Sequence, residues 1–425
     1  MLAEELRGVG TKGGKYLDYS TTQGLGAIDR VLPTSGPARE LIVSALGDLT
    51  CSDFIVGEIE LKLQLREFQQ RSDPRLIALE GFEDPETIAR EIIDSFESLP
   101  WNYRTTFALP SAMSNLLGLF DEYRVGRSNL RLLRSSMQMA TEFPLPPKSQ
   151  YQSLLAVMLE SAIPPWEWEA DGIYIQTQSE GYIGQYGNSL AAHAAQSQAK
   201  SFLGLGLAVN LLSAGVSTHP STKWKLAVVH RQTPEPRWVY HTSYRLDDGI
   251  AQGVSRMQLR ENDSDFPPQA RSFWSSSRMR RIAAAYDSTL DTSQLMSAAQ
   301  WHFDSYSRQN ELLAFVQAMV VLEIVFGDKK VSHLLGINEL IASRYAYLVS
   351  KTPKERTASM AELRRIYEVR SNIVHSGKSR LSREEKMLFF RLQHMAGTAI
   401  SKELELIEAT ATDETTTAVL RALER

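Results

Sequence analysis

Arg370 and His375 stand five positions apart near the end of a predicted amphipathic helix, with Ser371 and Asn372 between them. Arginine is a permanent cation whose planar fork of donors fits a phosphate group. Histidine can accept and return a proton near neutral pH. Cleavage of RNA without a metal needs such groups: a base for the 2′-hydroxyl proton, an acid for the leaving 5′ oxygen and a cation for the charged phosphorus centre. The pattern therefore suggests phosphodiester chemistry on RNA.

These residues can be given separate roles in that chemistry. His375 is the candidate for the base or the acid, Arg370 for the phosphate clamp, and Ser371 and Asn372 for donors that orient the substrate. DNA lacks the 2′-hydroxyl and would be spared. The competing structural interpretation is that Arg370 pairs with Glu323 or Glu368 and that His375 caps its own helix.

Helix geometry limits how Arg370 and His375 can act together. Five positions of an ideal α-helix rotate by about 500°, so the two side chains would point roughly 140° apart. Either the helix ends between them, for which Ser376 and Gly377 are suitable residues, or two copies of the chain pool their side chains at a two-fold interface.

The segment from Tyr367 to Gly377 resembles the Arg-polar-x-x-x-His motif of HEPN domains, closest to the ApeA-like branch with its "YxxRSxIVHxG" pattern. Upstream, Ala318 to Gly327 resembles that branch's "ALE-apolar-apolar-G" helix end. The likeness covers roughly the last third of the chain. HEPN domains often have Asn directly after the Arg, whereas here Ser371 holds that place and Asn372 follows.

The resemblance implies a small helical bundle, ribonuclease activity, a homodimer with facing motifs and a role in bacterial antiphage defence by abortive infection. Glu323 and Tyr367 are then candidates to support the motif residues. The alternative is a non-catalytic HEPN module for dimerisation or RNA binding. Some HEPN domains serve nucleotidyltransferases, but the paired Gly-Ser and Asp-x-Asp signature of those enzymes is absent from this sequence.

Composition sets the outer limits of the prediction. A chain of 425 residues suggests two or three domains, and its 43% hydrophobic content is ordinary for a globular protein. The single cysteine, Cys51, excludes an internal disulfide and makes a Cys-based metal site unexpected. No apolar run approaches a membrane span and the first residues do not resemble a signal peptide, so we expect a cytoplasmic protein. We also expect no metal and no cofactor. The net charge of -4 means that contact with RNA must be local.

We predict an α+β N-terminal region followed by an all-α, HEPN-like bundle. The expected divisions are a flexible arm (1–35), a mixed α/β sensor or regulatory domain for an unknown trigger ligand or phage protein (36–250), a junction (251–290), the bundle (291–410) and a loosely held tail (411–425). The glycines at 8–14 do not form a phosphate loop, because no strand precedes them and Tyr16 follows Lys15 where Ser or Thr is needed.

Within the α/β region, alternation predicts a strand through Ile59, Leu61, Leu63 and Leu65, and another from Arg75 to Phe82. Asp84 and Pro85 predict the start of a helix that reaches Leu99. The remaining predictions are a hairpin over 171–186 broken at 179–181, a helix over 189–212, and paired strands over 223–230 and 237–245.

Two further groups of residues could bind a ligand. Trp166, Trp168, His230, Trp238 and His241 could line a pocket, although aromatic residues in strands more often pack in a core. Cations beside aromatic residues can grip single-stranded RNA, although a short basic run is more often a solvated face. That second group is Arg271, Trp274, Arg278, Arg280 and Arg281.

The C-terminal third has the periodicity of helices joined by short loops, which favours an antiparallel bundle. Helices are predicted from Thr292 or Ser293, over 312–326 with Gly327 as the stop, over 331–349, over 356–370, and from a capping box of Ser382 and Glu385 to about Glu408.

Overall fold

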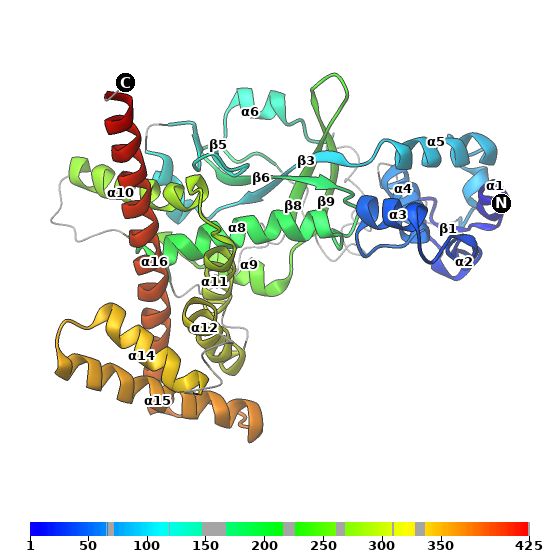
Figure 1. The fold of residues 1–425 in the computed structure, drawn as a ribbon. Helices are drawn as coiled ribbons and strands as arrows, with labels where there is room; N and C mark the ends of the chain where they lie inside the picture. The colour runs from blue at the N-terminus through cyan, green and yellow to red at the C-terminus, as the bar shows by residue number, and fades with distance from the viewer. Residues whose placement is uncertain are drawn as a thin grey trace.

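The computed structural model describes residues 1–64, 66, 72–118, 120–146, 167–215, 226–260, 268–307, 310–327 and 336–423. Its N-terminal part combines helices with a six-stranded sheet, and its C-terminal part is mostly helical (Figure 1). The predicted order of an α+β part before a helical part is therefore correct.

Residues 1–35 are folded, so the predicted flexible arm is wrong. They contain α1 (Leu2–Gly8), the small hairpin of β1 (Thr11–Lys12) and β2 (Tyr16–Leu17), and α2 (Gly26–Val31). Leu6 and Leu25 are each 1% exposed and belong to the main core. The apolar residues are too widely spaced for a periodicity to show, yet Leu6, Val9, Leu17 and Leu25 are all buried.

The predicted strand through Ile59 and Leu63 is instead part of helix α4 (Cys51–Leu63), which follows α3 (Pro37–Leu46). Thr50 and Asp53 form a capping box at the start of α4. Glu58 and Glu60, which supplied the polar half of the apparent alternation, are themselves buried. The alternation of apolar and charged residues in α4 therefore does not separate a buried face from an exposed one, and the pattern wrongly predicted a half-buried strand.

The segment from Arg75 to Phe82 is also not a strand. It makes one isolated bridge, between Arg75 and Gly10, and then a 3-10 turn over Leu76–Ala78. Its buried residues, Leu76, Leu79 and Phe82, recur every three positions rather than every two. The next prediction is confirmed: Asp84 caps α5 (Pro85–Glu97) by accepting a hydrogen bond from the Glu86 amide.

The sheet has the strand order β4-β5-β6-β3-β8-β9, and every neighbouring pair is antiparallel. The predicted pairing of β8 with β9 is confirmed. The predicted hairpin over 171–186 is wrong, because β6 runs unbroken and pairs along the whole of β3. The strands are β3 (Trp101–Ala108), β4 (Glu122–Arg124), β5 (Arg131–Arg134), β6 (Ile173–Gly181), β8 (Leu226–Gln232) and β9 (Trp238–Arg245).

The aromatic and histidine side chains of this sheet are packed, as the core interpretation predicts. His230 is fully buried, and its Nε2 donates a hydrogen bond of 3.0 Å to the Pro144 carbonyl. Trp168 and Trp238 join a small cluster around Phe143, which follows α6 (Met137–Glu142). His241 Nε2 is bonded to the Ile183 carbonyl at 2.8 Å. Trp166 and residues 223–225 lie outside the described residues.

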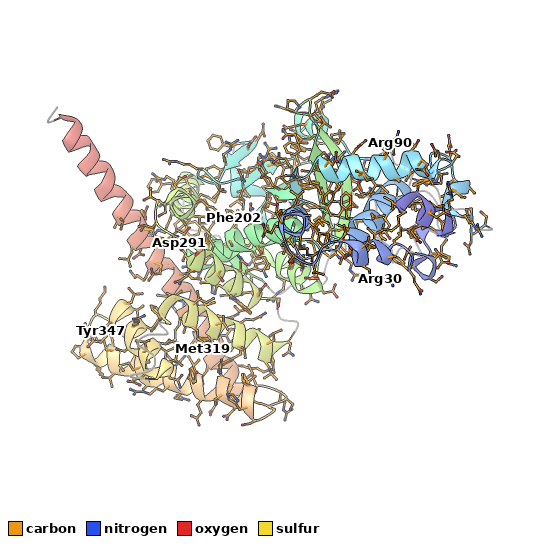
Figure 2. The ribbon with its side chains drawn as sticks, turned by 45° about the vertical axis from the view of Figure 1, so that its right-hand side comes forward. Arg30, Arg90, Phe202, Asp291, Met319 and Tyr347 are labelled. Atoms are coloured by element: carbon orange, nitrogen blue, oxygen red, sulfur yellow. The ribbon has the colours of Figure 1, made fainter. Side chains whose placement is uncertain are left out.

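Helix α8 (Leu190–Ala208), predicted over 189–212, lies between the sheet and the C-terminal helices (Figure 1). Phe202 of α8 is fully buried at the centre of the molecule (Figure 2). A Cβ added at Gly204 would lie 1.8 Å from the Ala299 carbonyl oxygen, so this glycine permits α8 to approach α11 (Ser293–Asp304) closely. The two parts of the chain therefore share one core.

The predicted junction at 251–290 contains regular structure: the end of α9 (Asp248–Ser255), strand β10 (Met257–Leu259) paired with β7 (Leu212–Ala214), and α10 (Pro268–Asp287). The breaking residues at 261–267 lie outside the described part. The described residues of this segment are mostly helix and strand, so the predicted irregular junction is wrong for them.

The helices described beyond residue 290 follow the predicted order, but some ends differ. α12 (Glu311–Phe326) is capped by Gly327, and α14 (Ile337–Val349) corresponds to the helix predicted over 331–349, whose first residues are not described. α15 (Pro353–His375) is longer than predicted at both ends. α16 (Arg383–Leu423) has the predicted Ser382–Glu385 capping box but continues as helix into the segment predicted to be a loose tail.

Candidate functional site

The motif residues occupy the last turns of α15. Thr352 and Glu355 form a capping box at the start of this helix, with Pro353 in its first turn. At the other end the Ser376 amide bonds to the Asn372 carbonyl at 3.1 Å, and Gly377 adopts a φ of 63°, which ends the helix.

The helix therefore does not end between Arg370 and His375, and that expectation is wrong. Ser376 and Gly377 do stop the helix, but they stop it after His375. On a continuous helix the two motif side chains leave the axis roughly 140° apart. One copy of the chain cannot converge both on one phosphate.

Arg370 is half-buried between α15 and α12. Its Nη2 lies 3.5 Å from Glu323 Oε1, and its guanidinium carbon lies 5.6 Å from the centre of the Tyr367 ring. Its Nε is buried without a hydrogen-bond partner among the described residues. Burial raises the pKa of Glu323, and the charge of Arg370 opposes that rise. The pair contributes to the packing of α15 on α12 and leaves part of the guanidinium without a bond.

His375, roughly 140° around α15 from Arg370 on an ideal helix, is exposed. Its ring makes no hydrogen bond within the described part of the chain. Asn372 is exposed and Ser371 is half-buried. These side chains can therefore meet a ligand from solvent.

A hollow of about 770 Å³ begins two residues after His375. We call it the basic hollow, because four of its nine lining residues are cations and one is a carboxylate. It is lined by Glu311 at the start of α12, by Gly377, Lys378, Ser379, Arg380, Leu381 and Ser382 of the α15–α16 loop, and by Arg383 and Lys386 of α16.

Glu311 fixes the loop to the bundle. Its Oε1 accepts a hydrogen bond of 3.1 Å from the Leu381 amide, and its Oε2 lies 2.8 Å from Lys386 Nζ. These two bonds also lower the pKa of Glu311, the bond to Lys386 contributing most. Lys378 pairs with Glu385 at 3.0 Å.

Arg380 and Arg383 also line the basic hollow, but they differ from the two lysines in their contacts. Both are exposed, and neither has an ion-pair partner among the described residues. Neither arginine is among the site residues predicted from the sequence. The signal was present, since four cations fall within the nine residues 378–386, directly after the motif.

The basic residues of α10 lie elsewhere. Arg281 pairs with Glu405 at 3.3 Å and with Glu408 at 3.5 Å, which places α10 about 33 Å along α16 from Arg383, at a rise of 1.5 Å per residue. Figure 1 shows α10 crossing the upper half of α16, whereas α15 crosses its lower end. The second predicted RNA-binding group is thus not part of the motif site.

Among that group, several cations already have intramolecular contacts. The Arg278 guanidinium lies 5.5 Å from the Trp274 ring, and burial, followed by the charge of Arg281, lowers the pKa of Arg278. Arg280 is exposed, and the side chain of Arg271 lies outside the described residues.

Three more findings bear on function. No grouping of three or more His, Cys, Asp or Glu side chains suited to a metal ion occurs in the described residues. No helix within the same residues combines the length and apolar character needed to cross a bilayer. Comparisons with protein-family models, with curated proteins and with solved structures gave no match to this chain.

The arrangement brings together a histidine open to solvent, a fixed loop, and two arginines that have no ion-pair partner in the described part of the chain. An exposed imidazole can transfer protons, and unpaired guanidinium groups can bind phosphate oxygens. The site can therefore bind a polyanion and act as an acid or a base on it.

Proposed function

We propose that the protein is a HEPN-type endoribonuclease that cleaves RNA without a metal ion, with its motif at the end of α15. The observation that carries the proposal is the exposed His375 beside the basic hollow, in a segment that resembles the HEPN motif. By the same resemblance, the setting is bacterial defence against phage by abortive infection. The N-terminal α+β region would then hold the nuclease in check or respond to a trigger.

The chemistry needs two proton transfers and a cation at one phosphodiester, and solvent water takes the transfer that the motif histidine does not. A base removes the proton of the 2′-hydroxyl, whose oxygen bonds to phosphorus while the bond from phosphorus to the 5′ oxygen breaks. An acid protonates that oxygen, which leaves a cyclic phosphate and a 5′-hydroxyl. His375 takes one of the proton-transfer roles, Arg370 stabilises the charged phosphorus centre, and Ser371 and Asn372 orient the phosphate.

A homodimer is part of the proposal, because Arg370 and His375 diverge on one helix. In a two-fold dimer, Arg370 of one copy can face His375 of the other. Exposed apolar side chains on the three helix ends around the loop support such an interface: Leu313, Val374, Met387 and Phe390. Light scattering should give the mass of two chains, and a fully active monomer over the working concentrations would contradict the dimer.

A non-catalytic module for dimerisation or RNA binding is the second candidate. The observation in its favour is the contact of Arg370 with Glu323 and Tyr367, which gives Arg370 a structural role within one copy. In that case the basic hollow would still bind RNA, but His375 would take part in no reaction.

Cleavage assays separate the two candidates. Purified protein is incubated with total RNA in EDTA, beside His375→Ala and beside His394→Ala, which removes another exposed histidine of the same region. The nuclease proposal predicts cleavage by the wild type and His394→Ala and its loss in His375→Ala. Cleavage that EDTA abolishes and magnesium or manganese restores contradicts the metal-free mechanism. Equal cleavage by His375→Ala contradicts the assigned role of His375.

A further inference from the structure

We propose that the basic hollow binds the phosphate backbone of single-stranded RNA close to the bond that the motif cleaves. The position relative to that bond rests on the proposed nuclease function. The binding itself does not, and it can be measured in a protein that cannot cleave.

The hollow is an open depression that is large enough to hold part of an RNA strand. Its volume of about 770 Å³ falls within the range of about 300–1,000 Å³ that is usual for ligand pockets. Its lining comes from the α15–α16 loop and from the starts of α12 and α16. A strand of RNA can enter from solvent, since the loop residues on its rim are exposed.

The charges of the hollow divide into structural and open ones. Lys378 and Lys386 are paired with Glu385 and Glu311 and hold the loop in place. Arg380 and Arg383 have no such partner in the described structure. Glu384 is exposed beside Arg383 but does not line the hollow. The guanidinium groups that remain open are suited to phosphate oxygens, to which arginine donates two parallel bonds.

The loop is fixed before any ligand binds. The Leu381 amide is bonded to Glu311, and the Ser382 amide is bonded to Glu385 at 2.7 Å. A loop already held in one conformation loses less entropy on binding than a flexible basic tail would. The unpaired arginines therefore belong to a preorganised surface.

The hollow is also close to His375. Arg380 stands five positions after His375, so their Cα atoms cannot be more than about 18 Å apart. A phosphate held by Arg380 therefore belongs to a nucleotide near the one that contacts His375. The basic residues of α10 are too distant along α16 to hold the same phosphates.

The test measures RNA binding by the full-length His375→Ala protein, so that cleavage does not interfere. A fluorescent single-stranded RNA oligomer is titrated by anisotropy at several KCl concentrations. In this background, Arg380→Ala with Arg383→Ala is compared with Arg30→Ala with Arg90→Ala. The second pair removes the same charge from exposed positions on the N-terminal helices, far from Tyr347 of the bundle (Figure 2).

Loss of Arg380 and Arg383 should weaken binding roughly tenfold or more. It should also reduce the slope of log K against log salt by about 0.7 for each phosphate contact that is lost. The control pair should leave the slope unchanged. All four arginines are exposed, so equal melting temperatures should show that every variant is folded.

The proposal is overturned if the Arg380 and Arg383 variant binds RNA with the parent's affinity and slope, or if the control pair loses as much. The two proposals fail separately. Binding that depends on Arg380 and Arg383 in a protein whose wild type never cleaves RNA supports the phosphate site and contradicts the nuclease. If the wild type cleaves RNA but loss of the two arginines leaves RNA binding unchanged, the nuclease is supported and the phosphate site is contradicted.

Discussion

The sheet of the N-terminal region and the motif end of the helical region use the same polar residue types in opposite ways. In the sheet, His230 is bonded to a carbonyl and enclosed by aromatic rings. Arg131 is bonded to Gln176 at 2.7 Å and paired with Glu122 and Glu142. At the motif end, His375, Arg380 and Arg383 face solvent without such partners in the described structure.

The difference shows why residue type is a poor guide to function without burial. His230 and His302 are both enclosed, so they cannot exchange a proton with a bound substrate. The basic hollow, by contrast, contains two arginines, Arg380 and Arg383, that have no ion-pair partner in the described structure. The candidate site is therefore defined by which polar groups are left open.

The largest expected effect is that of Arg370→Lys on cleavage. Lysine keeps the charge but lacks the planar fork, so we expect cleavage to fall by about a hundredfold or more. Replacing one partner of this half-exposed ion pair should change stability by only about 1 kcal/mol. Gel assays and thermal melts of the same samples measure both quantities.

A small change in cleavage with a large loss of stability would make Arg370 a structural residue, like Arg131 of the sheet. If Arg370→Lys cleaves at the wild-type rate, the clamp role is wrong. If the variant and Glu323→Gln both lose several degrees of melting temperature together with activity, the contact with Glu323 is structural, and the non-catalytic candidate gains.

The second prediction concerns stability below neutral pH. Burial lowers the pKa of His230 to about 4 and that of His302 to about 3. In the unfolded chain each would titrate near 6.5. The unfolded state thus binds more protons, and stability should fall as the pH falls from about 6.5 towards these folded values.

Each buried histidine should add about 1.4 kcal/mol per pH unit to that slope. Urea titrations between about pH 6.5 and 4.5 should therefore give a shallower slope for His230→Gln than for the wild type, with the carboxylates titrating alike in both proteins. An unchanged slope would mean that His230 can take up a proton in the folded state, and the contrast between the two regions would weaken.

The third prediction tests whether the two regions share one core. A side chain at position 204 would press on the Ala299 backbone of α11, so Gly204→Ala should destabilise the protein by about 1–3 kcal/mol. Gly26→Ala is the control, because its added Cβ meets nothing within 4 Å. If both variants melt at the same temperature, α8 and α11 are not tightly packed at this position, and the claim of one shared core is weakened.

Local signals predicted the elements that have strong caps or a clear period. The start of α5 at Asp84 and Pro85, the pairing of β8 with β9 and the capping box of α16 are examples. Prediction failed where burial depends on distant partners. Glu60 is buried and accepts hydrogen bonds from the hydroxyls of Tyr19 and Tyr186, and no pattern within α4 contains that information.

The motif was visible in the sequence, but its surroundings were not. Ser376 and Gly377 correctly marked the end of a helix, although only the structure shows that His375 lies within it. The role of Glu311 depends on a bond across seventy positions of the chain. The basic hollow therefore required the structure, even though its four cations are adjacent in the sequence.

The central claim is that Arg370 of one copy and His375 of the other form one site. Heterodimers of Arg370→Ala and His375→Ala, purified through two different tags, test it most directly. In such a heterodimer one of the two composite sites has lost both residues and the other is intact, so it should recover about half of the wild-type activity. The parent homodimers should be inactive. A heterodimer as inactive as its parents would contradict the account.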